Sequence, residues 1–227
     1  MILGVVFTLG SMLAGDLSAK FLHQEQPEKL AAYEWHFDTE SHADLVLFGS
    51  LDEKTQEVNG AIKIPGLLSF LADNNTNTEV KGLDEFPKDL QPPMIVHYYF
   101  DLMVSMGVFC LVVSGAYVLT LIFKKLRKFT HSKPMLYGAL LTGPAAMLAI
   151  EFGWFLTEQG RQPWIVRGYL KVADAATQAG GLTLVTILFG LLYLVLIVTS
   201  AYVLIRMFKE KPAYKEVEAL ASERGDA

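Results

Sequence analysis

Apolar residues along the chain gather into a few long runs, separated by polar stretches of unequal length. Three runs, at 95–123, 135–158 and 182–208, each reach the roughly 20 mostly apolar residues that a helix needs to cross a bilayer. A fourth run, 1–15, is shorter. The pattern predicts an all-α, polytopic transmembrane helix bundle with three full spans, a partial N-terminal span and one long exterior loop.

The N-terminal run, residues 1–15, allows two interpretations. A secretory signal peptide would carry a charged region before its apolar stretch, and no basic residue precedes this run. We therefore favour a partial transmembrane helix, whose first turns would lie upstream of Met1.

Basic residues near the ends of the spans predict the orientation, because lysine and arginine in short loops stay on the cytoplasmic side. Such residues fill the loop 124–134 and begin the tail 209–227, so both are expected to be cytoplasmic. The segment 16–94 and the loop 159–181 would then be outside. Three basic residues in that outer loop run against the rule and call for a separate reason: Arg161, Arg167 and Lys171.

Composition and charge narrow the class further. Hydrophobic residues make up 52% of the 227 residues, and the net charge of −5 combines an acidic exterior segment and tail with a basic cytoplasmic loop. This distribution excludes a nucleic-acid-binding protein. The single cysteine, Cys110, lies inside a span, so we expect it to be a small packing group.

The first part of the exterior segment reads as a short helix from Glu25 to Trp35, with Pro27 at a tolerated early position. Lys29 and Glu34 lie on this helix. They are either solvated surface charges or, beside the aromatic Tyr33 and Trp35, the polar end of an apolar pocket suited to a hydroxylated ring.

Ionisable residues inside the spans carry a functional hypothesis, because burying a charge in a membrane is costly. Glu151, Trp154 and Glu158 follow one another at i, i+3 and i+7, which is one helix face, and Arg161 comes three residues later. The pair Glu158–Arg161 is either a buried pair that pins a helix end or a functional pair. In the second case the carboxylate binds a metal or carries a proton, and the arginine holds a carboxylate or a haem propionate.

The span 95–123 holds polar and sulfur-bearing residues near its exterior end: His97, Asp101, Met103 and Met106. A methionine in an apolar helix is usually a packing residue, but its thioether is also a soft axial ligand for haem iron. Asp101 has no obvious cation in its own helix, so we expect it to face a neighbouring segment or the headgroup region.

Three stretches together resemble a known family. EFGWFLTEQGRQPW, at Glu151–Trp164, closely resembles the signature near the C-terminus of subunit I of the bacterial cytochrome bd quinol oxidases, and its GRQPW core is highly specific. Gly15–Asp16 followed by KLAAYE, at Lys29–Glu34, resembles the start of that family's quinol-binding exterior loop. FDLMVSMG, at Phe100–Gly107, resembles its helix with a haem-ligating methionine. The resemblance covers nearly the whole chain but only the C-terminal half of the family's subunit.

The resemblance implies roles for several residues. Glu158 would be the axial ligand of the high-spin haem b, with Trp154 beside that haem and Arg161 near its carboxylates. Met103 would be one axial ligand of the low-spin haem b. Lys29 and Glu34 would belong to the quinol-oxidising site, and Glu151 matches an intramembrane glutamate of the family.

The chain also departs from the family's pattern. Asp101 stands where well-known members carry arginine, and a carboxylate there would oppose electron uptake by a nearby haem. The histidines that bind haem d and the low-spin haem b lie on earlier helices of the family, which have no counterpart here. His97 is the one histidine in a span, and it matches no family ligand.

The resemblance therefore implies a multi-pass protein of the bacterial cell membrane that oxidises quinol and passes electrons through haems to oxygen. Its partners would be the N-terminal half of subunit I, oxidase subunit II, membrane quinol and oxygen, and the chain alone is not expected to reduce oxygen. The alternative is a membrane transporter or sensor, in which Glu151, Glu158 and Arg161 form a proton relay or a structural pair.

Overall fold

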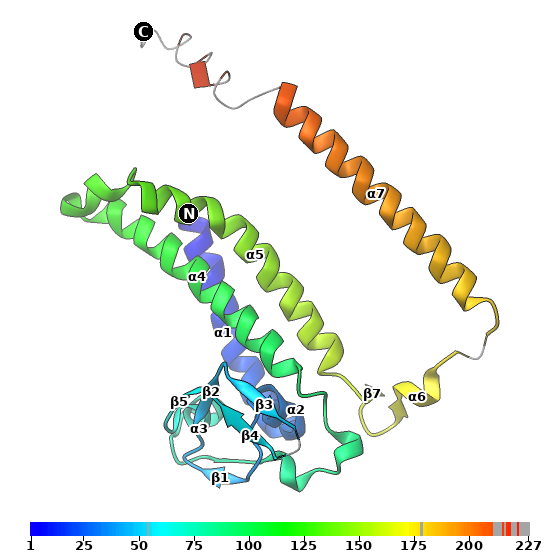
Figure 1. The fold of residues 1–227 in the computed structure, drawn as a ribbon. Coiled ribbons are helices and arrows are strands. Elements are labelled where there is room, and N and C mark those ends of the chain that lie inside the picture. The colour runs from blue at the N-terminus through cyan, green and yellow to red at the C-terminus, as the bar shows by residue number, and fades with distance from the viewer. Residues whose placement is uncertain (54, 178, 211–214, 216, 219–221, 223–227) are drawn as a thin grey trace. The chain divides into compact units, whose positions relative to one another are not determined.

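The computed structural model describes residues 1–53, 55–177, 179–210, 215, 217, 218 and 222. Four of the helices in this part of the chain are long and apolar enough to cross a membrane, and Figure 1 shows them: α1 (Ile2–Glu25), α4 (Val96–Ile122), α5 (Lys133–Gln159) and α7 (Leu182–Glu210). The predicted bundle of membrane-spanning helices is therefore confirmed.

The chain divides into two compact units, residues 1–175 and 176–227. The second unit contains α7. Most of the predicted tail 209–227 lies outside the described residues. The sites described below all belong to the first unit.

Helix α1 is longer than the partial span 1–15 that the sequence predicts. It continues past Gly15 to Glu25, and its 24 residues extend about 36 Å, which exceeds the roughly 30 Å hydrocarbon core. Asp16 and Lys20 lie one helical turn apart and pair with each other. This pair neutralises the two charges that made the run appear to end at Gly15.

The long segment between α1 and α4, residues 26–95 and called here the connecting segment, folds into short elements (Figure 1). Its helices are α2 (Pro27–Tyr33) and α3 (Leu67–Asp73), followed by single turns η1 (Leu83–Glu85) and η2 (Lys88–Leu90). Its strands form three antiparallel pairs: β1 (Glu40–Ser41) with β6 (Glu79–Val80), β2 (Leu45–Leu47) with β5 (Ile62–Ile64), and β3 (Ser50–Asp52) with β4 (Glu57–Asn59). The sequence does not predict these strands, because each is only two or three residues long.

Helix α2 agrees with the short helix expected from Glu25 to Trp35, but it is shorter at both ends. Gln26 breaks the helical path before Pro27, which takes the first helical position, where its missing N–H costs nothing. Trp35 ends it with a positive φ of 47°. One face of α2 packs on Leu68 and Val80 of the connecting segment, and the other packs on Val96 of α4 and Leu156 of α5.

Helices α4 and α5 pack through small residues on α5, as membrane helices commonly do because small side chains let backbones approach. A Cβ built on Gly138 would lie 3.1 Å from the Val113 side chain, and one on Gly153 would lie 3.1 Å from the Met103 sulfur. Cys110 is buried, with its sulfur 3.6 Å from the Thr142 carbonyl oxygen. The turn that joins the two helices is η3 (Lys124–Phe129).

The loop after α5 holds a small hairpin, β7 (Trp164–Val166) paired with β8 (Leu170–Lys171), and the short helix α6 (Val172–Ala175). Gly160 begins this loop at the point where α5 meets α2. A Cβ there would lie 2.3 Å from the Tyr33 hydroxyl oxygen and 2.6 Å from Tyr33 Cε1. Glycine is therefore needed for Tyr33 to donate its hydrogen bond to the Leu156 carbonyl, 3.3 Å away.

We predict that Gly160→Ala destabilises the fold by about 1–3 kcal/mol, because the added methyl group overpacks the Tyr33 contact. Thermal unfolding of the detergent-solubilised complex that contains this chain measures the change. Gly143→Ala, inside the helix that Gly160 follows and with nothing within 4 Å of the new methyl group, is the control. Tyr33→Leu combined with Gly160→Ala should recover part of the loss, and equal melting temperatures for the two single alanine variants would contradict the prediction.

Candidate functional site

The two polar residues predicted to share a site, Lys29 and Glu34, line different cavities. They lie five positions apart, which rotates them by about 140° around a helix axis and points them to different sides of α2. Lys29 faces the loop after α5, and Glu34 faces α4 and the strands of the connecting segment. Tyr33, between them, stacks on Phe100 of α4 at a centroid distance of 6.0 Å.

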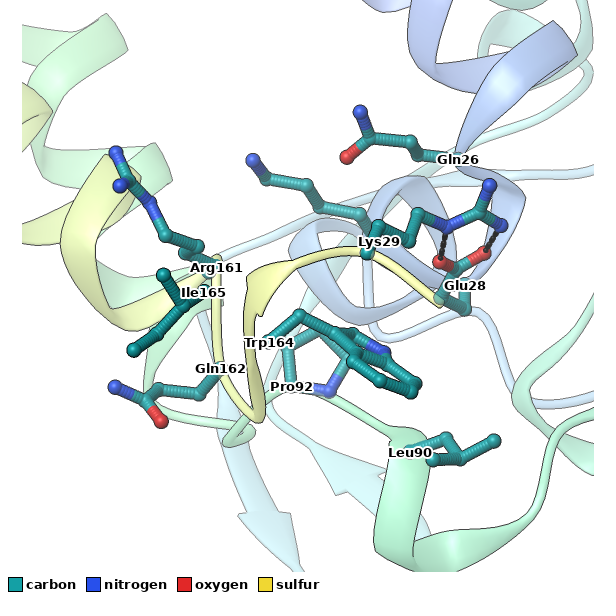
Figure 2. A pocket seen from close by; sticks show the side chains of 11 residues that line it. Gln26, Glu28, Lys29, Leu90, Pro92, Arg161, Gln162, Trp164 and Ile165 are labelled. Atoms are coloured by element: carbon teal, nitrogen blue, oxygen red, sulfur yellow. Dashed lines mark hydrogen bonds and ion pairs between the residues drawn. The ribbon is translucent and has the colours of Figure 1, made fainter. Parts of the chain in front are cut away.

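The Lys29 cavity, of about 220 Å³, is lined by α2 and the loop after α5 (Figure 2). Lys29 and Arg161 both reach toward it, together with Gln162 and Trp164 of the GRQPW stretch. Burial is the main cause that lowers the pKa of Lys29, and the nearby Arg161 charge lowers it further, against a smaller raising effect of Glu28. The cavity is lined by three cations, of which Arg167 is paired with Glu28, and by the amide side chains of Gln26 and Gln162. Such a lining suits an anionic or carbonyl-bearing ligand.

The other basic residues of the loop after α5 bind acids of the connecting segment. Arg167 forms a two-pronged ion pair with Glu28, at 2.6 and 2.9 Å, marked by dashed lines in Figure 2, and also donates to the Glu25 carbonyl. Lys171 lies 3.0 Å from Asp89. The sequence places these basic residues in the outer loop, against the usual rule. Their pairing with acids of the connecting segment gives a reason for that predicted position.

The Glu34 cavity is larger, about 380 Å³, and mostly apolar. Its walls include Leu45, Leu47 and Phe48 from the connecting segment and Phe100 and Asp101 from α4. Only 4% of Glu34 is exposed, and among the described residues its Oε2 has no hydrogen-bond partner. Burial raises the pKa of Glu34 to about 8, with a further contribution from the Asp101 charge.

Asp101 has a histidine neighbour in its own helix, a contact that was not among the expectations from the sequence. His97, four positions earlier, places its Nε2 3.3 Å from Asp101 Oδ2, although without the geometry of a hydrogen bond. The other ring nitrogen, Nδ1, donates to the Tyr33 carbonyl at 2.6 Å, and the ring stacks on Trp35. The i, i+4 spacing was the signal for this pair.

Asp101 also faces a neighbouring segment, as expected. The Phe48 amide of the connecting segment donates to Asp101 Oδ2 at 2.5 Å. The carboxylate is 3% exposed and therefore sits inside a network that joins α4, the end of α2 and the turn after β2.

The predicted face of α5 forms as expected but is exposed. Glu151, Trp154 and Glu158 are all solvent-exposed in the described chain, with Trp154 at 58%. Arg161 Nη2 lies 3.8 Å from Glu158 Oε1, and about half of each side chain is exposed. Within this chain the Glu158–Arg161 pair is therefore only partly covered, and both interpretations of it stay open.

Met103, by contrast, is half-buried. Its sulfur lies against Gly153, and its side chain packs on the cluster around Tyr33 and Val96. Among the described residues, no three histidine, cysteine or acidic side chains gather closely enough to hold a metal ion by themselves.

Comparison with known proteins identifies the family to which this chain belongs. Residues 1–212 match the family model of cytochrome bd terminal oxidase subunit I. The chain belongs to this family. With its four long apolar helices, it is a protein of the membrane.

Individual members of the cytochrome bd family are similar to this chain over most of its length. The chain is 37% identical to the putative cytochrome bd menaquinol oxidase subunit I of Bacillus subtilis over 97% of its length, and 32% identical to the cytochrome bd ubiquinol oxidase subunit 1 of the same organism over 92%. The structure of bd oxidase from Geobacillus thermodenitrificans superposes with a TM-score of 0.80 at 50% identity, over 92% of this chain.

The chain spans about half the length of the relatives that it matches: 49% and 47% of the two Bacillus subunits, and 48% of the Geobacillus chain. The cytochrome bd resemblance inferred from GRQPW, KLAAYE and FDLMVSMG is thereby confirmed. The roles of individual residues remain predictions.

We predict that Glu34→Gln stabilises the protein at alkaline pH and not at acidic pH. The folded-state pKa of about 8 lies above the ordinary carboxyl value of 4.5, so the folded form favours the protonated side chain. Stability from this group is complete below about pH 4.5 and is lost as the pH rises toward 8, by about 1.4 kcal/mol for each tenfold difference in proton affinity.

Melting temperatures measured from pH 5 to pH 9 test this. The glutamine variant should diverge upward from the unmodified protein up to about pH 8 and run parallel to it from there to pH 9. Glu57→Gln, at an exposed position on β4, is the control and should track the unmodified protein throughout. Parallel curves for Glu34→Gln would contradict the burial of an ionisable carboxyl.

Proposed function

We propose that this chain is the C-terminal part of a haem-containing quinol oxidase subunit, which oxidises membrane quinol and passes electrons through haems to oxygen as part of a larger complex. The observation that carries the proposal is the contact of Tyr33 with Leu156 and Gly160. It joins the stretch assigned to quinol, Lys29–Glu34, to the end of α5 that is assigned to haem.

Glu34 is suited to accept a proton from a quinol hydroxyl. Its carboxyl is buried, one of its oxygens has no partner among the described residues, and a pKa of about 8 lies close to physiological pH, where a proton acceptor works best. Lys29 lines the separate cavity on the other side of α2, so it would bind a carbonyl or anionic oxygen of a quinol bound there, and not the head group at Glu34. The relatives' names include both menaquinol and ubiquinol, so the proposal is for a quinol as a class.

The family binds haems b and d, and the residues of α5 fit one of them by their chemistry. Glu158 offers an exposed carboxylate for iron, Trp154 an exposed ring to pack beside a porphyrin, and Arg161 a guanidinium for a propionate. We assign these three to the high-spin haem b. When bound, haem supplies one-electron transfer and oxygen chemistry that no side chain of this chain provides.

Met103 would give one axial ligand to the low-spin haem b, since its half-buried thioether is a suitable soft donor. The second ligand, and the ligand of haem d, would come from the N-terminal half of subunit I, which the relatives have and this chain does not cover. Glu151, on the same face as Glu158, would carry a proton. Oxidase subunit II completes the proposed complex.

We also propose the orientation that the basic loop indicates. The turn η3 at Lys124–Phe129 would face the cytoplasm, and the connecting segment, with both cavities, would face outward. Protons from quinol would then be released outside.

We predict that Glu158→Ala selectively removes one haem b from the complex of both halves of subunit I with subunit II, because the iron loses its protein ligand. Haem extracted from purified complex and its visible spectrum measure the loss. Glu158→Gln should retain part of that haem through its carbonyl oxygen. Thr157→Ala, the neighbouring exposed residue on α5, should leave the haem content unchanged. Full haem content in Glu158→Ala would contradict the prediction and mean that Glu158 forms only an ion pair with Arg161.

We predict that Lys29→Ala and Glu34→Ala each slow oxidation of the natural quinol by about tenfold or more, because the first removes a charge-assisted hydrogen bond and the second a proton acceptor. Oxidation of an artificial donor that bypasses the quinol site should persist. Oxygen consumption with each donor measures both rates in the same preparation. Equal loss with the two donors would indicate a folding defect and contradict the assignment.

A further inference from the structure

The turn after β2 is the part of the connecting segment that closes the Glu34 cavity, and its backbone is unusual. Phe48 has a φ of 57° and Gly49 a φ of 108°, so two successive residues take left-handed conformations. Phenylalanine rarely adopts this region, because its Cβ approaches the following carbonyl. The surrounding structure must therefore hold Phe48 there.

Packing already fixes Gly49, since a Cβ on it would lie 3.0 Å from the Ala61 side chain and 3.1 Å from the Asn59 carbonyl. On the other side of the turn, the Phe48 amide points at α4 and donates to Asp101. This hydrogen bond joins residues 53 positions apart and connects the turn after β2 to a membrane-spanning helix.

Asp101 is buried among groups that are themselves fixed. Only 3% of Asp101 is exposed, and His97, one turn earlier, lies 3.3 Å from it without a hydrogen bond. His97 is fully buried, stacked on Trp35 at a centroid distance of 4.0 Å and bonded to the Tyr33 carbonyl. Close packing on α4 therefore limits the space into which the acceptor for the Phe48 amide can move.

The Glu34 cavity lies among these groups. Glu34, Phe48 and Asp101 all line it, and Glu34 immediately follows Tyr33, whose carbonyl receives the His97 bond. One network therefore positions both the acidic end of the cavity and the residue at its exposed edge, Phe48, whose side chain is 45% exposed.

We propose that Asp101 is a positioning residue for the Glu34 cavity, holding the Phe48–Gly49 turn over it by accepting the Phe48 amide hydrogen bond. The proposal rests on the proposed function, since it takes the Glu34 cavity as a binding place for the quinol head group. It also gives a reason for a carboxylate at this position, where the family resemblance leads one to expect arginine. The aspartate binds the connecting segment.

The test compares Asp101→Ala with Asp101→Asn in the complex of both halves of subunit I with subunit II. Asparagine keeps an oxygen that can accept from the Phe48 amide, and alanine does not. Asp73→Ala, at an exposed aspartate that ends α3 in the connecting segment, is the matched control.

Hydrogen–deuterium exchange over residues 45–49 reports the turn directly. Exchange there should quicken by about tenfold or more in Asp101→Ala, and remain near the unmodified rate in Asp101→Asn and Asp73→Ala. The apparent KM for quinol should rise by a similar factor in Asp101→Ala, with kcat within about twofold and recovery in Asp101→Asn. The haem spectrum should be the same in all four proteins, which excludes an effect through Met103.

Unchanged exchange at 45–49 in Asp101→Ala would overturn the proposal whatever the kinetics. Quickened exchange with an unchanged KM would also overturn it, because the turn would then be held without serving quinol binding. Failure of the proposed function is distinguishable from both, since the unmodified complex would then oxidise no quinol while the exchange difference persisted.

Discussion

The close contact between Tyr33 and the end of α5 is the constraint on which the rest of the first unit depends. The Tyr33 hydroxyl donates to the Leu156 carbonyl, its ring occupies the space that a side chain on Gly160 would fill, and its own carbonyl accepts from His97 of α4. Three helices therefore meet at one residue. Because Tyr33 is fixed, the two sides of α2 are fixed as well, and Lys29 and Glu34 open onto separate cavities.

Much of this architecture could be predicted from the sequence, and the features that could not be predicted have identifiable physical causes. The long apolar runs predicted α4, α5 and α7, since hydropathy is a strong signal over 20 residues. Strands of two or three residues leave no such signal. The end of α1 was misplaced because Asp16 and Lys20 look like a polar boundary until they are seen to pair along the helix.

The contacts at the candidate sites also divide into those that the sequence could predict and those that it could not. The face of α5 with Glu151 and Glu158 follows from helical spacing alone, and the His97–Asp101 contact could have been found by the same reasoning. The ion pair between Arg167 and Glu28 could not, because its partners are 139 positions apart and only the folded chain brings them together. The hydrogen bond from Phe48 to Asp101 was equally hidden, since a backbone amide carries no sequence signature.

Five acids of the first unit differ in how their charge is satisfied. Glu28 and Asp101 bind groups of this chain, and Glu34 is buried where its protonated form is favoured. Glu151 and Glu158 are instead exposed on a helix long enough to cross a membrane. Lipid cannot solvate a carboxylate, so a membrane helix keeps such residues only where a cation, a metal or a polar partner meets them. Arg161 at 3.8 Å is a weak and half-exposed partner for one of the two. We infer that the groups that satisfy this face come from outside the described residues, and the half of the family's subunit that this chain does not span is where such groups would be found.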